Sequence, residues 1–143
     1  MAGTFKFELV SPEKMLIPLK SEDPRKVAVA EAEQVIVPGS EGQFTVLAGH
    51  APVLTALRPG VIEIKLATGL RRVFVRGGFA EVEPARLTIL AQRVVDLDDK
   101  DELARKLGLE LTDAQAALSE AKDDAQRMIA KDAIDQLRGL AGA

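Results

Sequence analysis

The fold is decided by residues 37–52, Val-Pro-Gly-Ser-Glu-Gly-Gln-Phe-Thr-Val-Leu-Ala-Gly-His-Ala-Pro. Phe44 and Val46 alternate here with polar neighbours, which is the period of a half-buried strand. Glycine and proline lie on both sides of this segment and favour chain reversals, because glycine tolerates positive φ and proline presets φ. The stretch therefore predicts a turn, a short strand and a second turn.

Short segments of the same kind occur on both sides of this stretch. Phe5, Phe7 and Leu9 alternate with Lys6 and Glu8, and the pattern recurs at close spacing. Such spacing is typical of an all-β sandwich or barrel. A bulge or tight bend is expected at Gly77-Gly78. The expected strands cover residues 5–10, 15–17, 34–37, 43–46, 53–57, 61–66, 71–76, 79–83 and 86–91.

Residues 21–33 differ in composition from the flanking segments. They are mostly charged residues and alanine, with Pro24 among them. We expect a surface excursion there, with a helical turn over residues 26–32.

The hydrophobic period changes after residue 95. Apolar residues then recur at steps of three and four, which predicts an amphipathic helix, and a second helix is expected from about Lys122. Their apolar faces should form the seam of an antiparallel hairpin. The predicted fold is therefore α+β, with a β-sandwich over residues 1–95 and a helical hairpin over residues 96–143. The predicted seam consists of Leu103, Leu107, Leu111, Leu118, Ile129, Ala133 and Leu137.

Composition excludes several classes of protein. There is no cysteine, so neither disulfides nor thiolate metal sites are expected. The formal charge is −3 and Trp and Tyr are absent, which disfavours nucleic-acid binding. No apolar run approaches the ~20 residues of a transmembrane helix, and residues 1–4 do not resemble a secretory signal. We expect a soluble chain.

Few residues are candidates for catalysis. His50 is the single histidine, and the sequence offers it no nucleophile at motif spacing. It is interpreted as a loop residue that shapes a contact surface, with a purely structural hydrogen bond as the alternative. The glycines at 39, 42, 77 and 78 are interpreted as turns, because no Gly-Lys-Ser/Thr follows them.

Charged clusters have simpler explanations than a metal or acid–base site. The acidic set lacks the spacing of a calcium loop, and the electrostatics of a helix start explains its aspartates. That set comprises Glu81, Glu83, Asp96, Asp98 and Asp99. A basic set fits either salt bridges to a partner or an ordinary solvated face. It comprises Arg71, Arg72, Arg76 and Arg86.

Several ordered motifs resemble one known family over nearly the whole chain. The sequence is similar to the ε subunits of bacterial F-type ATP synthases, whose mitochondrial counterparts are δ subunits. The motifs are Val37-Pro38-Gly39-Ser40-Glu41-Gly42, Gly49-His50-Ala51-Pro52, Leu57-x-Pro59-Gly60-x-Ile62, Phe74-Val75-x-Gly77-Gly78-Phe79-x-Glu81-Val82 and Leu87-Thr88-Ile89-Leu90-Ala91.

The resemblance implies a non-catalytic rotor-stalk subunit without cofactor or metal. Its sandwich would bind the γ subunit on one side and the membrane c-ring on the other, with transient contacts to the α and β subunits. The implied location is peripheral, on the cytoplasmic side of the bacterial inner membrane. The implied ring-facing loops contain Ser40, Glu41, Gln43 and His50, although Gln43 is often acidic in relatives.

The sequence departs from the family at two places. Some relatives bind ATP through Ile/Leu-Asp-x-x-Arg-Ala, but here Asp101 and Glu102 replace the arginine and the alanine. A carboxylate in place of a phosphate-pairing cation reverses the local charge, so we expect weak ATP binding or none. Residues 21–33 also form a longer connection than relatives usually have.

In some relatives the helical hairpin extends along the stalk and blocks ATP hydrolysis. Charges of both signs are balanced along the second predicted helix, which argues against a strong clamp on an acidic partner. Three alternatives remain open. They are an ATP sensor in which the ligand holds the hairpin folded, a β-sandwich adaptor that dimerises through its helices, and a hydrolytic enzyme.

Overall fold

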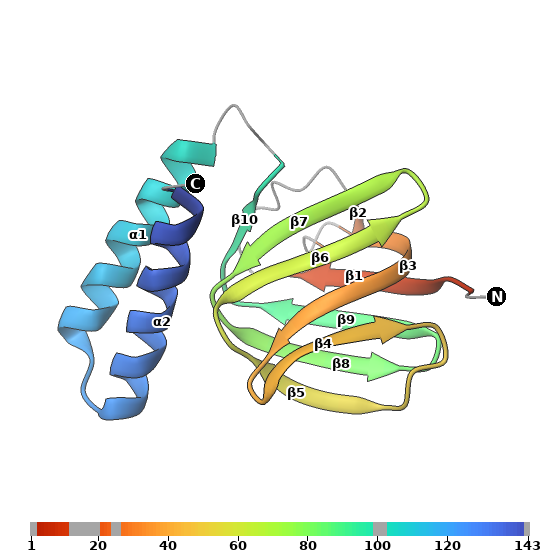
Figure 1. Cartoon of the computed structure of the whole chain (residues 1–143), viewed down its shortest axis with the longest axis horizontal. Coiled ribbons are helices and arrows are strands. Elements are labelled where there is room, and N and C mark those ends of the chain that lie inside the picture. Colours follow the sequence, from red (N-terminus) through yellow and green to blue (C-terminus); the bar gives the residue numbers. More distant parts are fainter. Residues whose placement is uncertain (1–2, 12–20, 24–26, 99–102, 142–143) are drawn as a thin grey trace. The chain divides into compact units, whose positions relative to one another are not determined.

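A computed structural model of the chain describes residues 3–11, 21–23, 27–98 and 103–141. Two compact units are present, Met1–Asp98 and Asp99–Ala143. The first is built from strands and the second from two helices (Figure 1). The predicted α+β class, a β-sandwich followed by a helical hairpin, is confirmed.

Ten strands are found among the described residues of the first unit. Several strands alternate buried and more exposed side chains, as in β1, β8 and β9, which is the pattern of a half-buried sheet. The strands are β1 (Phe5–Val10), β2 (Ser21–Asp23), β3 (Val27–Gly39), β4 (Gly42–Leu47), β5 (Val53–Leu57), β6 (Gly60–Leu66), β7 (Gly69–Val75), β8 (Gly78–Glu83), β9 (Arg86–Ala91) and β10 (Val94–Asp96).

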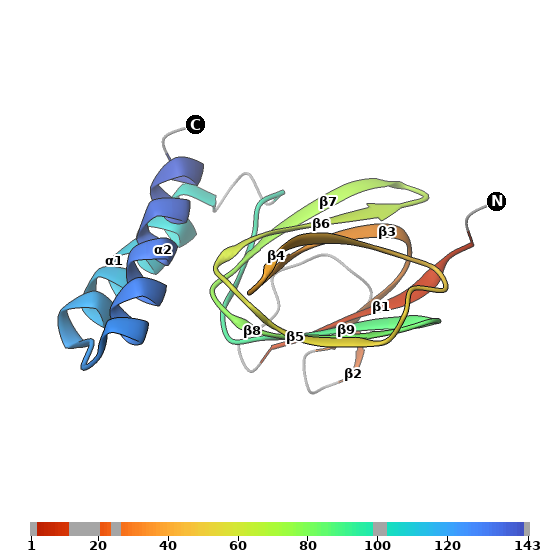
Figure 2. The ribbon, with the colours of Figure 1, turned by 60° about the horizontal axis from the view of Figure 1, so that its bottom comes forward.

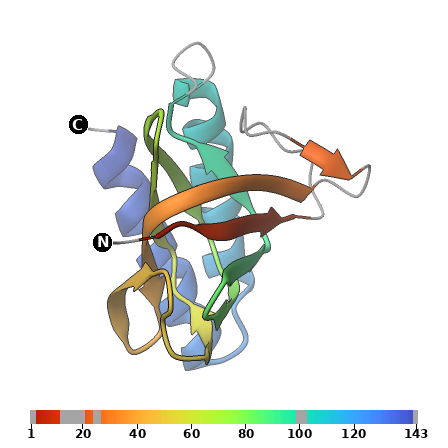
Figure 3. The ribbon, with the colours of Figure 1, turned by 90° about the vertical axis from the view of Figure 1, so that its right-hand side faces the viewer.

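The strands form two layers that share one long strand. The hydrogen-bonded order is β1-β9-β8-β5-β3-β6-β7-β10, with β2 and β4 also paired to β3. One layer contains β1, β9, β8 and β5, and the other contains β4, β6 and β7 (Figure 2). The first half of β3 pairs with β1 and the second half with β4 and β6 (Figure 3). This change of partners at Ala32 joins the layers.

The space between the layers is filled by the inward side chains. Phe7, Leu9, Ile64, Leu87 and Ile89 are fully buried. Burying each of the larger side chains contributes roughly 1.5–3 kcal/mol to folding. The alternation recognised in the sequence at Phe5, Phe7 and Leu9 therefore identifies core positions.

The expected helical turn over residues 26–32 is wrong. Residues 27–32 belong to β3 and pair with β1 in antiparallel register, from Val10 opposite Val27 to Phe5 opposite Ala32. Alanine-rich composition favours a helix locally, but pairing with a central strand overrides that preference. The strands β2 and β10 were not predicted, and the expected strand at residues 15–17 lies outside the described residues.

The chain turns from β7 into β8 through two glycines with positive φ, Gly77 (+144°) and Gly78 (+133°). A Cβ atom on Gly78 would collide with the backbone carbonyl of Leu90 on β9. The tight bend predicted at Gly77-Gly78 is thus present, because only glycine permits both this φ and this approach of two strands.

The second unit is a pair of helices, α1 (Leu103–Glu120) and α2 (Asp124–Ala141), that pack against each other. Between them, Asp123 accepts a hydrogen bond from the backbone N–H of Gln126 at 2.7 Å. The Gln126 side chain accepts one from the N–H of Lys122 at 2.9 Å. These bonds cap the start of α2 and define its first residue.

Most of the predicted seam residues in the helices are buried or half-buried, but Ile129 is not. Its side chain is 56% exposed, whereas Ala130 is 4% exposed. Buried positions in α2 recur at Ala130, Ala133 and Leu137, and one residue of offset rotates a side chain by about 100° around the helix. The placement of Ile129 in the seam is therefore corrected to Ala130.

Candidate functional site

The residues expected to face a partner lie on both sides of β4. Ser40 and Glu41 form the turn between β3 and β4, and both are exposed. His50 follows β4 in the loop that leads to β5. A strand of six residues spans roughly 17 Å, so the turn and the loop are at opposite ends of β4.

The β3–β4 turn is tied to the neighbouring strand β5. The N–H of Ser40 donates to the carbonyl of Ala56 at 2.9 Å, and the N–H of Arg58 donates to the carbonyl of Pro38 at 3.0 Å. The Ser40 and Thr55 hydroxyls lie 3.4 Å apart. These contacts leave Glu41 projecting from a turn whose backbone is held in place.

Close packing supports the same turn from inside. A Cβ on Gly39 would lie 2.9 Å from the Phe44 ring, and one on Gly60 would lie 2.9 Å from Pro38. Gln43, the next predicted contact residue, is exposed and pairs with Pro38 in the ladder. The structure therefore brings Ser40, Glu41 and Gln43 together at one end of the sandwich.

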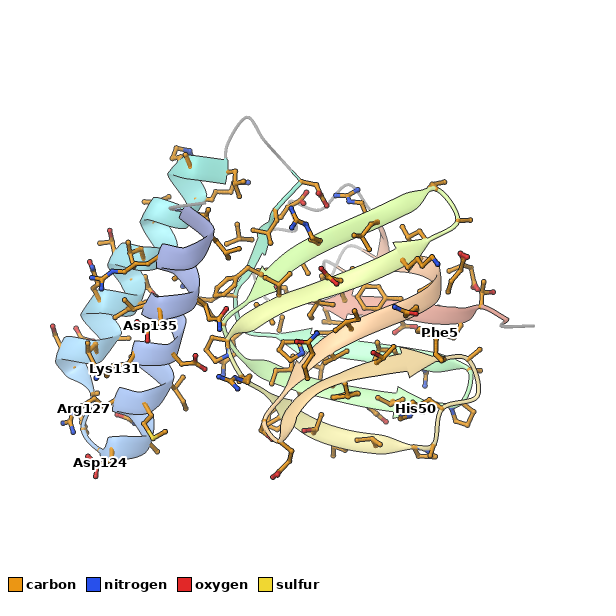
Figure 4. All side chains as sticks on the ribbon, viewed as in Figure 1. Phe5, His50, Asp124, Arg127, Lys131 and Asp135 are labelled. Atoms are coloured by element: carbon orange, nitrogen blue, oxygen red, sulfur yellow. The ribbon has the colours of Figure 1, made fainter. Side chains whose placement is uncertain are left out.

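His50 lies at the other end of β4 (Figure 4). Its Nδ1 donates a hydrogen bond to the carbonyl of Ala51 at 2.9 Å, and its ring is 6.5 Å from that of Phe44, centroid to centroid. Gly49, at φ +81°, donates its N–H to Pro84 in the β8–β9 turn at 2.7 Å. His50 thus shares no site with Glu41 and has its own backbone partner.

Sequence reasoning missed an apolar row on the outer face of the β1-β9-β8-β5 layer. Ala56 on β5 faces Phe79 on β8, and Phe79 faces Leu90 on β9. Leu90 in turn faces Val10 on β1. Phe79 is 52% exposed, Leu90 46% and the adjacent Leu54 73%. We call these five residues the outer apolar row.

The outer apolar row and the β3–β4 turn lie at the same end of the sandwich. Ala56, which begins the row, is also the residue whose carbonyl holds Ser40. Contiguous exposed apolar side chains of this kind mark protein–protein contacts more often than solvent-facing surface. The sequence did contain a signal for this row. Leu90 and Phe79 fall at outward-facing positions of strands whose inward-facing positions are already apolar.

The opposite end of the same face is charged. Lys6 pairs with Glu8 and Arg86 with Glu83, each at 3.2 Å. The hydrogen bond to Glu83 raises the pKa of Arg86 above its ordinary value. One face of the sandwich therefore changes from apolar beside the β3–β4 turn to charged toward the β8–β9 turn.

The arginines considered for partner-facing salt bridges have internal roles in two cases. Arg86 pairs with Glu83, and Arg71 pairs with Asp96 and Asp98 at 3.2 Å each. The attribution of these aspartates to a helix start is wrong, because α1 begins at Leu103 and Asp96 ends β10. Asp99 lies outside the described residues. So do Asp101 and Glu102, the two residues that were compared with the ATP motif.

The exposed face of α2 carries charges of both signs. Asp124, Arg127, Lys131 and Asp135 follow one another along the helix (Figure 4). Arg127 donates to Asp124 at 2.9 Å. Positive charge on this face is therefore partly neutralised within the helix itself.

The described residues contain no group of three or more histidine or acidic side chains placed to hold a metal ion. Neither helix that the structure describes has the length and apolar character needed to cross a membrane. The described features that bear on function are the β3–β4 turn, the outer apolar row, the His50 loop and the helices.

Comparison with known proteins places these surfaces in one family. Residues 4–96 match the family described as ATP synthase, Delta/Epsilon chain, beta-sandwich domain. The ATP synthase epsilon chain of Mesorhizobium japonicum is 43% identical over 100% of this chain and 97% of its own length. That of Parvibaculum lavamentivorans is also 43% identical, over 98% and 97%.

Solved structures agree with the sequence matches. A chain in the cryo-EM structure of the Euglena gracilis mitochondrial ATP synthase, OSCP/F1/c-ring, superimposes with a TM-score of 0.58 at 26% identity, covering 94% of this chain and 78% of that one. A chain of the Tetrahymena thermophila central stalk/c-ring shares the fold, with a TM-score of 0.61 at 14% identity over 96% of both. On its sequence over the full length and on its fold, this chain belongs to the ATP synthase delta/epsilon chain family.

Proposed function

We propose that this chain is a non-catalytic subunit of the central stalk of a proton-translocating F-type ATP synthase. It connects rotation of the membrane c-ring to the γ subunit. The observation that carries the proposal is the exposed outer apolar row beside a rigid, exposed turn at one end of the sandwich. Family membership and the c-ring assemblies that contain similar folds support it.

The outer apolar row is the proposed contact with γ. A permanent partner removes exposed Leu54, Phe79 and Leu90 from water, and burial contributes about 25 cal/mol for each Å² of apolar surface. Flat apolar surface of this kind suits a stable subunit interface. The paired charges at the other end of the face supply a polar rim.

The β3–β4 turn is the proposed contact with the c-ring. Ser40, Glu41 and Gln43 are exposed there, and Glu41 offers a carboxylate to a polar or basic loop. The backbone bonds to β5 resist displacement of the turn, which suits a contact that transmits torque. His50, at the far end of β4, contacts the same partner only if that partner extends roughly 17 Å along the sandwich.

The proposed location is peripheral, on the cytoplasmic side of the bacterial inner membrane, held there by the complex. The helical hairpin makes transient contacts with the α and β subunits. Balanced charge on α2 makes it a weak clamp on acidic surfaces, so we propose at most a modest effect on ATP hydrolysis.

Affinity purification from detergent-solubilised membranes tests the proposal. The tagged chain should recover γ, the α and β subunits and the c-ring. Leu54→Gln places an uncharged polar group in the outer apolar row at a position so exposed that the fold should be unaffected, and recovery of γ should fall at least tenfold.

The matched control is Leu70→Gln. Leu70 is 55% exposed on β7, in the other layer, so the same substitution there should leave recovery of γ unchanged. Equal recovery of γ with both variants would show that the outer apolar row is not part of the interface. Recovery of the wild-type chain alone, as a homodimer, would favour the adaptor alternative over a stalk subunit.

A further inference from the structure

Three carboxylates lie on the outer face of the β1-β9-β8-β5 layer, and two of them are paired within the chain. Glu8 on β1 is paired with Lys6, and Glu83 on β8 is paired with Arg86, each at 3.2 Å. The third carboxylate is Glu81 on β8. Its side chain is exposed and forms no ion pair or hydrogen bond with the residues that the structure describes.

Strand register explains why the arginine on this face binds Glu83 and not Glu81. Arg86 on β9 lies directly opposite Glu83, whereas the residue opposite Glu81 is the uncharged Thr88. The hydrogen bond to Glu83 is the largest cause of the raised pKa of Arg86, and the charge of Glu81 is the smallest of the contributions that raise it. Glu81 therefore presents a carboxylate without a cation of its own.

The same register places Glu81 beside the outer apolar row. Leu54, which is 73% exposed, lies opposite Glu81 on β5, and the Cβ atoms of directly opposed residues are about 5 Å apart. Phe79 precedes Glu81 by two residues on the same face of β8, at a separation of about 7 Å. A partner surface that contacts both Leu54 and Phe79 therefore also covers Glu81.

The free energy of covering Glu81 depends on what the partner brings to it. Burial of the apolar side chains favours association. A carboxylate that is removed from water without a cation or hydrogen-bond donors opposes association strongly. A stable complex through the outer apolar row therefore requires the partner to supply a positive charge at Glu81.

We propose that Glu81 determines which partner surface the outer apolar row accepts, and that this surface carries a lysine or arginine within an apolar patch. The inference rests on the proposed stalk function, in which the row binds γ, and it specifies the chemistry of the γ surface. The cation lies about 7 Å from the apolar side chains that contact Phe79, because Glu81 and Phe79 have that separation on β8. An apolar surface with a carboxylate at this position is rejected.

Binding of the purified full-length chain to an F1 sector prepared without it tests the inference. Glu81→Gln keeps the size of the side chain but removes its charge, so the cation of γ loses its counter-ion. Binding should weaken at least tenfold, chiefly through faster dissociation, because a buried charge pair acts mainly after the encounter. Glu81→Lys brings two like charges together and should weaken binding at least a hundredfold.

The matched control is Glu63→Gln. Glu63 lies on β6 in the other layer, and its replacement changes the net charge by the same amount. This variant should bind as the wild type does, and equal weakening in Glu63→Gln and Glu81→Gln would reduce the effect to net charge and overturn the proposal. Thermal unfolding checks the fold, which should be unchanged because Glu81 is exposed.

The direction of the change in Glu81→Gln separates the possible results. Tighter binding would show that Glu81 is buried without a cation, since removing an unpaired charge lowers the cost of burial, and would overturn the proposal. Unchanged binding, together with weaker binding of Leu54→Gln, would overturn it as well but leave the outer apolar row as the γ contact. Unchanged binding of both variants would overturn the proposed γ interface itself.

An exchange of charges identifies the cation on γ. Each lysine and arginine of γ is replaced in turn by glutamate, and the resulting F1 sectors are assayed with Glu81→Lys and with the wild-type chain. One replacement should restore binding of Glu81→Lys at least tenfold while weakening binding of the wild type. If no replacement restores binding, the charge pair at Glu81 is refuted.

Discussion

Replacing Gly78 by alanine should destabilise the sandwich because of its backbone conformation and because of the β9 strand beside it. Gly78 has φ +133°, where a side chain is strained by about 1–3 kcal/mol. The new Cβ would also collide with the Leu90 carbonyl, which must move away. Separation there weakens about two ladder hydrogen bonds, at about 1 kcal/mol each. The expected total is about 4 kcal/mol.

Gly42→Ala separates the two contributions. Gly42 has the same φ, +133°, but a Cβ there meets nothing within 4 Å. The Gly42→Ala variant should therefore lose only the stability that the strained backbone conformation costs, about 2 kcal/mol. The difference of about 2 kcal/mol between the variants measures the close approach of β8 and β9.

Urea unfolding followed by methyl NMR is the suitable assay. The chain has neither Trp nor Tyr for fluorescence, and the helices dominate circular dichroism. The methyl groups of the buried Ile62, Ile64 and Ile89 report on the sandwich alone. Equal losses of stability in Gly78→Ala and Gly42→Ala would show that the contact with Leu90 is relaxed without cost and would refute the reasoning.

Three further predictions concern the turn, the hairpin and ATP. Glu41→Lys should weaken the coupling of proton flow to ATP synthesis in reconstituted vesicles, and His50→Ala tests the other end of β4 separately. Unchanged coupling in Glu41→Lys would show that the β3–β4 turn does not contact the ring. Leu137→Ala should destabilise the hairpin by about 2–5 kcal/mol, since Leu137 is fully buried, whereas the exposed Ile129→Ala should change stability by under about 0.5 kcal/mol in thermal unfolding. Similar losses in the two would contradict the corrected seam. Calorimetric titration with ATP should give no binding in the micromolar range, and a micromolar site would favour the sensor alternative.

Local patterns in the sequence were sufficient to predict most strands of the sandwich. Alternation at Phe5, Phe7 and Leu9 identified inward positions, because a strand with one buried face must repeat every two residues. The two glycines at 77 and 78 predicted a bend whose positive φ angles other residues rarely adopt. Such features depend on near neighbours in the chain, which sequence reveals directly.

Features that depend on distant partners were not predicted. Residues 27–32 have helix-forming alanines, and they are a strand because β1 lies beside them. The aspartates near residue 96 appeared to be helix-start charges, and they are bound by Arg71 from β7 instead. In both cases contacts between residues 17 to 27 positions apart outweigh the local preference.

The sequence by itself determined the α+β class, the core parity of the strands, the turn and loop around β4, and the family resemblance. Only the tertiary structure decided which surfaces these residues share. Strand pairing sets Glu41 and His50 at opposite ends of β4 and aligns Ala56, Phe79, Leu90 and Val10 into one row. The physical reason is that periodicity assigns a side chain to a face, whereas register between strands, set by packing of the whole sheet, assigns its neighbours on that face.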